Sequence, residues 1–163
     1  MSRVFITTST FCEFSKEPLL ILEKERFEIT LNRENRKITH NEMEESISKY
    51  DGIIAGTENY DEQILSLAKD LKVISRIGVG IDNIDLECAA EKNIKVFKSQ
   101  TSPAPAVAEL VICLILNLIR KVSVQSNQLN IGIWKKQMGS LFSGKTLGII
   151  GLGTIGKKVV EFT

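Results

Sequence analysis

Three glycines near the end of the sequence have the spacing at which a backbone can bind a phosphate group. Gly151, Gly153 and Gly156 form a GxGxxG pattern directly after the apolar run 146–150. In this pattern the first glycine permits a tight strand-to-helix turn, the second allows close approach to a pyrophosphate, and the third lets the helix pack on the strand. The N–H groups of the helix start then face the phosphates. The residues predict the opening of a Rossmann dinucleotide-binding unit.

A second group with chemical potential lies in the loop 76–85. Arg76 ends an apolar run, and its planar guanidinium could bind a carboxylate or a phosphate. Gly78 and Gly80 would leave backbone N–H groups open to an anion. The alternative is a surface arginine beside a turn, and we favour ligand binding. Asp85 is typical of a helix N-cap.

Alternating strands and helices must position these two loops. Strands are predicted at 4–7, 27–31, 52–56, 72–76 and 94–97. Helices are predicted to begin near Pro18, Thr39, Asp61 and Asp85. Short links between the elements indicate an α/β fold, a parallel sheet with helices on both faces. Ligands of such sheets bind at the carboxyl ends of the strands, where the Arg76 loop lies.

Pro103 and Pro105 interrupt this pattern and place a domain boundary between residues 1–100 and 101–163. A helix is predicted over 106–121, with a single narrow polar face. That face carries Glu109, Cys113, Asn117 and Arg120. A helix this apolar is expected to be buried on most sides, by interdomain packing or in a dimer interface, with equal support for each. A strand at 146–150 and a helix at 155–162 should follow.

Composition excludes several other classes of function. The net charge is +1 and no basic stretch is interleaved with aromatic residues, so we expect no nucleic-acid partner. Cys12, Cys88 and Cys113 are widely spaced and form no CxxC pair, which argues against a metal site and favours a reducing compartment. The first residues lack a signal-peptide core, and the most apolar run, 106–119, is shorter than the roughly 20 residues that span a bilayer. We therefore expect no membrane partner and a cytoplasmic location.

Three stretches together resemble the D-isomer-specific 2-hydroxyacid dehydrogenases, and the phosphoglycerate dehydrogenase branch most of all. They are residues 71–85, 106–110 and 144–156, which occur in the family's order and spacing. The resemblance implies a flavodoxin-like, five-stranded substrate-binding domain over 1–100. The segment 101–163 would then hold the interdomain helix and the truncated start of a Rossmann NAD-binding domain. The implied reaction is hydride transfer between NAD and a 2-hydroxy acid such as 3-phosphoglycerate, with NADP not excluded.

The resemblance also assigns residues. Arg76, Gly78 and Gly80 would bind the 2-hydroxy or 2-oxo acid, Arg76 at its anionic end. Cofactor-binding positions would be Val79 on the nicotinamide side and, at the pyrophosphate, Gly151, Gly153, Thr154, Ile155 and Gly156. The helix 106–121 would form a homodimer, as the corresponding helix does in the family.

The chain also departs from the family pattern. Many members carry an asparagine in the loop where this chain has residues 102–105, so a substrate contact there is in doubt. The family's catalytic arginine, glutamate and histidine lie in the distal half of the NAD domain, so we expect no catalytic residue here and no activity of the chain alone. His40, the only histidine, is interpreted as a surface residue. The alternative is a non-catalytic binding or dimerising fragment of the same fold, similar to a corepressor.

Overall fold

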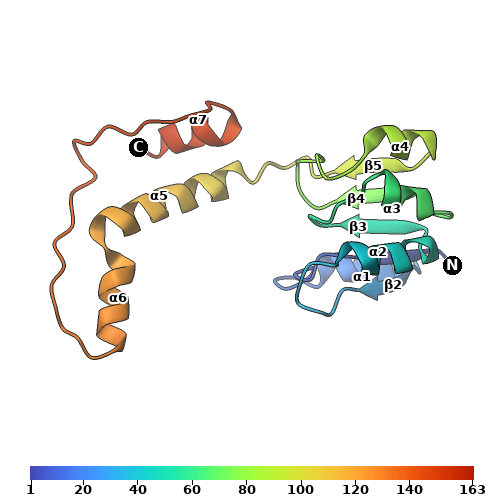
Figure 1. The fold of residues 1–163 in the computed structure, drawn as a ribbon, viewed down its shortest axis with the longest axis horizontal. Coiled ribbons are helices and arrows are strands. Elements are labelled where there is room, and N and C mark those ends of the chain that lie inside the picture. Colours follow the sequence, from blue (N-terminus) through green and yellow to red (C-terminus); the bar gives the residue numbers. More distant parts are fainter. The chain divides into compact units, whose positions relative to one another are not determined.

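The computed structural model describes all residues from 1 to 163. The chain forms two compact units, Met1–Thr101 and Ser102–Thr163. Most of their helices and strands are labelled in Figure 1. The sequence placed its domain boundary one residue earlier, at residue 100.

The first unit is built on a five-stranded parallel sheet. Its strands are β1 (Arg3–Ile6), β2 (Glu28–Leu31), β3 (Gly52–Ala55), β4 (Val73–Arg76) and β5 (Lys95–Lys98). Their order is β2-β1-β3-β4-β5, with every neighbouring pair parallel. The predicted α/β fold with a five-stranded parallel sheet is confirmed. Chain connections leave β1 and β3 in opposite directions, which makes the gap between these two strand ends the topological switch point where ligands bind in such sheets.

Short helices connect the strands. They are α1 (Glu17–Lys24), α2 (His40–Ser46) followed by the 3-10 turn η1 (Ile47–Lys49), α3 (Glu62–Leu67) and α4 (Leu86–Glu91). The predicted N-caps are present. Thr39 forms a capping box with Glu42, while Asp61 and Asp85 each accept a backbone N–H of their own first turn. Because these hydrogen bonds join residues that are close in the sequence, the helix starts can be predicted from the sequence.

The core lies on one face of the sheet. Phe5, Ile53 and Ile74 occupy matching register positions on that face and belong to one buried cluster with side chains of α2, α3 and α4. No side chain of α1 is buried, and right-handed crossovers place this helix on the opposite face. On that second face Ser75 is exposed and Phe97 is 56% exposed. Helices therefore lie on both faces, but the second face is covered only near β1 and β2.

The second unit contains three helices, α5 (Ala104–Arg120), α6 (Val122–Asn130) and α7 (Thr154–Glu161). α5 begins two residues earlier than predicted because Pro105 lies in the first turn, where no intrahelical N–H is needed. Lys121 adopts a left-handed conformation with φ 55° and ends α5. α6 was not predicted from the sequence. No helix in the structure has both the length and the hydropathy that a membrane span requires.

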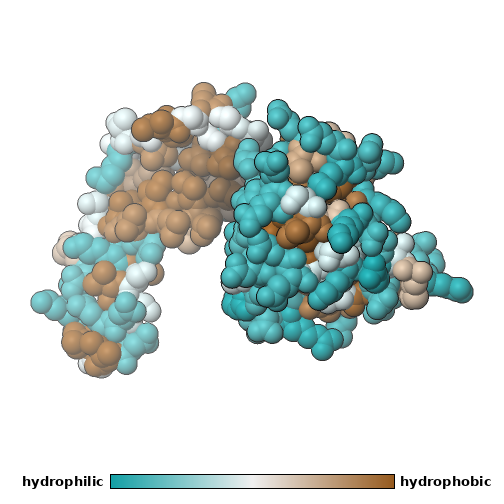
Figure 2. Space-filling model, turned by 45° about the vertical axis from the view of Figure 1, so that its right-hand side comes forward, coloured by the Kyte–Doolittle hydropathy of each residue, from teal (hydrophilic) through white to brown (hydrophobic).

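One prediction for this unit is wrong. Residues 146–150 form no strand, because no segment of the chain hydrogen-bonds to their backbone and a strand exists only within a ladder. The apolar side chains of α5 are exposed within the single chain, where Leu110, Leu114 and Leu118 are 57%, 50% and 75% exposed, so the burial expected from interdomain packing or from a dimer interface stays a prediction. Figure 2 shows a broad apolar patch in the upper part of this unit and smaller, separate apolar patches in its lower part.

Candidate functional site

The guanidinium of Arg76 is held against the loop that follows β4. Its Nη1 donates a hydrogen bond to the carbonyl oxygen of Ile77, and its Nε is buried without any partner. Gly78 lies directly beneath the guanidinium, where a Cβ atom would collide with it. The backbone of Gly78 also has φ 132°, a conformation that favours glycine. Glycine is therefore required at position 78 for two reasons, and it lets Arg76 fold over the loop.

Only one of the two glycine N–H groups expected to be open to an anion is free of a partner in the chain. Gly78 donates its N–H to Ser99 Oγ at 3.0 Å, and the Ser99 N–H donates back to the Gly78 carbonyl at 3.0 Å. The prediction that Gly78 offers a bare N–H to an anion is therefore wrong. Gly80 donates its N–H to no group of the chain, and Val79 is 39% exposed. Val79 and Gly80 thus stand free to contact a ligand, whereas Arg76, with Nη1 bonded to Ile77 and Nε buried, offers only its Nη2. The binding roles of all three residues stay predictions.

A buried polar network joins the carboxyl ends of β1 and β3, and sequence reasoning missed it. Thr7 and Tyr60 are fully buried and Glu58 is 4% exposed. Thr7 Oγ1 donates to Glu58 Oε2 at 2.7 Å and lies 3.3 Å from the Tyr60 hydroxyl, and Gly56 donates its N–H to Glu58 Oε2 at 3.0 Å. Burial raises the pKa of Tyr60. The available signal was the polar residue that directly follows β1, Thr7, and the carboxyl residue three positions after the end of β3, Glu58.

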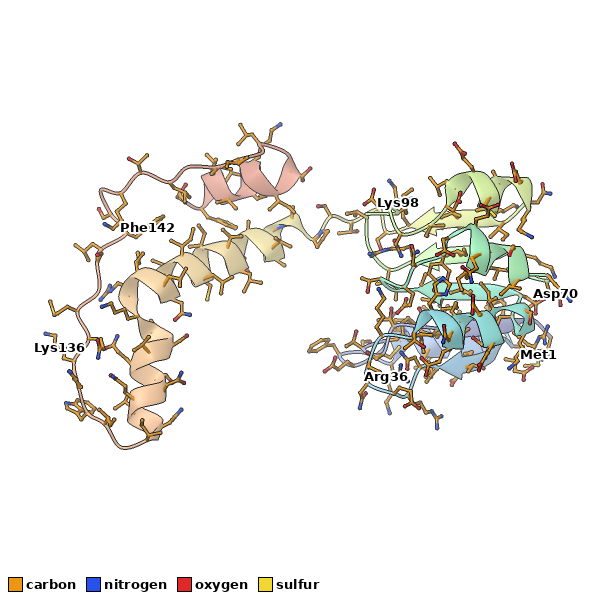
Figure 3. The ribbon with its side chains drawn as sticks, viewed as in Figure 1. Met1, Arg36, Asp70, Lys98, Lys136 and Phe142 are labelled. Carbon is orange, nitrogen blue, oxygen red and sulfur yellow. The ribbon has the colours of Figure 1, made fainter.

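Two asparagines extend this network to neighbouring loops. Asn32 Nδ2 donates to the carbonyl oxygens of Thr7 and Arg36, each at 2.7 Å. Asn83 Nδ2 donates to the Glu58 carbonyl at 2.5 Å. The loops after β1, β2, β3 and β4 are therefore bound together at one edge of the sheet. In Figure 3, Lys98 and Arg36 mark this carboxyl edge, and Met1 and Asp70 mark the opposite edge.

A cavity of about 290 Å³ opens at the same edge. Its lining combines hydroxyl, charged and apolar groups from the loops after β1, β2, β3 and β4: Thr8, Ser9, Thr10, Lys37, Gly56, Thr57, Glu58 and Ile77. Ile77 also belongs to the Arg76 loop, and its N–H donates to the Ala55 carbonyl at 2.9 Å. The cavity and the Arg76 loop are therefore adjacent parts of one ligand-facing edge.

The glycine motif of the second unit has the geometry of a phosphate-binding helix start. Gly153 is the N-cap of α7, and Thr154 and Ile155 open its first turn. Gly151 has φ 93°, and a Cβ at Gly156 would collide with the Gly151 carbonyl oxygen. The N–H groups of residues 154–156 donate to no group of the chain, so they are available to an anion. The residues present fit the pyrophosphate of a dinucleotide.

His40 connects two helices instead of standing free on the surface. Its Nε2 lies 3.1 Å from Asp61 Oδ2, and its Nδ1 lies 3.7 Å from Glu44 Oε1. The hydrogen bond from the Ile64 backbone N–H, together with His40, lowers the pKa of Asp61. His40 therefore links the start of α2 to the start of α3. We assign it a structural role.

Together these features define an α/β protein with a ligand-facing sheet edge and a dinucleotide-type glycine motif. The family model described as D-isomer specific 2-hydroxyacid dehydrogenase, catalytic domain, matches residues 4–156. The chain belongs to this family, whose members are NAD-dependent 2-hydroxyacid dehydrogenases.

Individual relatives agree with the family match. The hydroxypyruvate reductase of Thermotoga maritima is 35% identical over 148 residues, which cover 86% of this chain and 48% of the relative. The D-3-phosphoglycerate dehydrogenase of Methanocaldococcus jannaschii is 40% identical over 128 residues, 76% of this chain and 24% of the relative. The crystal structure of the TT0316 protein from Thermus thermophilus has a TM-score of 0.86 at 28% identity, covering 98% of this chain and 52% of that one. The chain thus spans about half or less of the length of the relatives it matches.

Proposed function

We propose that this chain carries the substrate-binding domain and the first part of the NAD-binding domain of a 2-hydroxyacid dehydrogenase. The reaction is hydride transfer between NAD and C2 of the acid. The observation that carries this proposal is the Arg76 loop, where a guanidinium whose Nη2 donates to no group of the chain lies in the same loop as the exposed Val79 and the free N–H of Gly80. A carboxylate can accept a charge-assisted hydrogen bond from this guanidinium. Arg76 therefore binds the anionic end of the acid.

The glycine motif is assigned to the cofactor. Gly151 and Gly153 allow close approach of the backbone, the N–H groups of Thr154, Ile155 and Gly156 bind the pyrophosphate, and the bound NAD supplies the hydride acceptor. NADP would use the same groups. Val79 belongs to the nicotinamide side of the first unit.

Two substrates are suggested by the relatives and by Arg76. The phosphoglycerate dehydrogenase relatives and the arginine favour a 2-hydroxy acid such as 3-phosphoglycerate. The hydroxypyruvate reductase relative suggests the unphosphorylated counterpart. Both acids offer a carboxylate to Arg76, and they differ only at C3, which carries a phosphate in one and a hydroxyl in the other.

Titration of residues 1–163 with D-glycerate, followed by amide NMR, tests the acid-binding role. We expect the Val79 and Gly80 amides to shift, and Arg76→Met to weaken binding by roughly 10- to 100-fold, since hydrogen bonds to charged groups contribute about 1.5–3 kcal/mol. Arg33→Met removes an exposed arginine from the loop after β2 and serves as the control. Equal affinity of Arg76→Met and the parent chain would contradict the proposal.

We further propose that the 163-residue chain does not catalyse by itself, because the resemblance places the catalytic arginine, glutamate and histidine outside it. Consumption of NADH with 2-oxo acids by the purified chain would disprove this.

A second candidate function is a non-catalytic, dimerising fragment. It is favoured by the exposed apolar side chains of α5, which we assign to a homodimer through residues 106–121. We place the protein in the cytoplasm.

A further inference from the structure

We infer that the cavity at the carboxyl ends of β1 and β3 selects an acid with a free hydroxyl on C3 and rejects the phosphorylated form. The inference rests on the proposed function, since it assigns the carboxylate of the same acid to the Arg76 loop. It adds a specificity determinant, the pair formed by Thr8 and Glu58. Neither residue was singled out by the sequence.

Glu58 provides a buried carboxyl group with one open acceptor oxygen. Its side chain is 4% exposed, and Oε2 accepts hydrogen bonds from Thr7 Oγ1 at 2.7 Å and from the Gly56 N–H at 3.0 Å. Oε1 accepts no hydrogen bond within the chain, and Glu58 lines the cavity. Oε1 is therefore free to accept a proton donor from a ligand.

Thr8 provides the complementary donor. Its Oγ1 is buried and has no hydrogen-bond partner, which is rare for a buried polar atom. A Cβ atom on Gly56 would lie 2.7 Å from Thr8 Oγ1 and 3.0 and 3.3 Å from the two Glu58 carboxylate oxygens. Thr8 and Glu58 thus converge on the same side of Gly56, which only a residue without a Cβ leaves open. One ligand hydroxyl can donate to Glu58 and accept from Thr8.

The position of the cavity allows a single small acid to use both sites. Ile77 lines the cavity and directly follows Arg76 in the chain, and its backbone is fixed to β3 by the hydrogen bond to Ala55. An acid whose carboxylate is bound by Arg76 can therefore extend its C3 group toward Thr8 and Glu58. The volume of about 290 Å³ accommodates a three-carbon acid.

Charge repulsion makes the cavity prefer a C3 hydroxyl over a C3 phosphate. A phosphate group in the cavity would face the Glu58 carboxylate, and like charges at close range in a buried site strongly disfavour binding. Lys37 is the one cation of the lining, and it is exposed, so water screens its attraction. We expect the phosphorylated acid to bind at least about tenfold more weakly than the hydroxylated one.

Three acids that differ only at C3 test this inference by amide NMR titration of the 163-residue chain. D-lactate carries a methyl group, D-glycerate a hydroxymethyl group and D-3-phosphoglycerate a phosphorylated one. We expect D-glycerate to bind most tightly, D-lactate roughly 3- to 10-fold more weakly for loss of the hydroxyl contacts, and D-3-phosphoglycerate most weakly. Affinity for D-3-phosphoglycerate equal to or above that for D-glycerate would overturn the inference.

Two variants assign the selectivity to its residues. Thr8→Val removes a hydroxyl that makes no internal hydrogen bond, so the fold should be retained while the preference for D-glycerate over D-lactate falls to less than about twofold. Glu58→Gln keeps the shape and removes the charge, and should raise the relative affinity for D-3-phosphoglycerate by about tenfold. Glu91→Gln makes the same charge change on the exposed side of α4 and should leave all ratios unaltered.

The outcomes separate this inference from the proposed function. If the acids shift the Val79 and Gly80 amides but the ratios of their affinities are unchanged by Thr8→Val and Glu58→Gln, the acid site is supported and the assignment of selectivity to Thr8 and Glu58 is wrong. If none of the three acids shifts those amides, both proposals fail.

Discussion

Replacing Thr7 with valine should lower the free energy of unfolding by about 3 kcal/mol. Valine has nearly the same shape, so the fully buried site keeps its packing and the change removes only the hydroxyl. The 2.7 Å hydrogen bond to the Glu58 carboxyl group is lost, at about 1.5–3 kcal/mol. The Tyr60 hydroxyl loses its only partner, and a buried unsatisfied group costs about 1–3 kcal/mol. Partial relaxation brings the sum to about 3 kcal/mol.

Urea unfolding of the 163-residue chain, followed by far-UV circular dichroism, measures this loss. Tyr60→Phe alone should cost about 1 kcal/mol, because it removes one neutral hydrogen bond. In the double variant the hydroxyl of Tyr60 can no longer be left unpaired, so the total should fall short of the sum of the single changes by about 1 kcal/mol. Thr30→Val, at an exposed position of β2, should stay within about 0.5 kcal/mol of the parent.

The reasoning is refuted if Thr7→Val costs less than about 1 kcal/mol, the lower bound for leaving one buried group unpaired. Strict additivity of Thr7→Val and Tyr60→Phe would also refute it, because the two hydroxyls would then act independently. The slope of the urea transition should be unaltered, since neither change exposes new surface on unfolding.

Four other expectations follow from the same structure. Gly78→Ala should destabilise the chain by about 1–3 kcal/mol and weaken acid binding, because its φ is positive and the Cβ displaces the arginine. Gly80→Ala, at an ordinary φ with only one contact at 3.4 Å, is the control for stability. Because burial raises the pKa of Tyr60, its contribution to the free energy of unfolding is complete below the unfolded pKa of about 10 and is lost at higher pH. Tyr60→Phe should therefore reduce the loss of stability that accompanies a rise in pH above about 10. Because the pKa of Asp61 is lowered, its contribution is present above the unfolded pKa of about 4 and is lost as pH falls through the lower folded value, so Asp61→Asn should reduce the slope of an acid titration of stability. Sedimentation equilibrium should show a dimer that Leu114→Glu converts to a monomer, and a monomeric parent chain would contradict the homodimer.

Local signals were sufficient for most of the first unit. Apolar runs of four or five residues placed the five strands, and Thr39, Asp61 and Asp85 marked helix starts because a cap is a hydrogen bond between residues three apart. The same locality explains the glycine motif, whose turn and helix start lie within six residues. Ladder formation is not local, which is why the apolar run 146–150 was mistaken for a strand. Its sequence has the right composition, but the chain gives its backbone no hydrogen-bond partner.

The sequence by itself determined the family, the sheet and the two glycine-rich loops, since each depends on a pattern of residues that are close together in the sequence. The tertiary structure alone decided what those loops present to a ligand. Ser99 occupies the Gly78 N–H from 21 residues away, and Thr7 reaches Glu58 from 51 residues away. The physical reason is the parallel sheet, which sets the carboxyl ends of its strands side by side whatever their separation along the chain. Spacing in the sequence therefore does not reveal the pocket around Glu58.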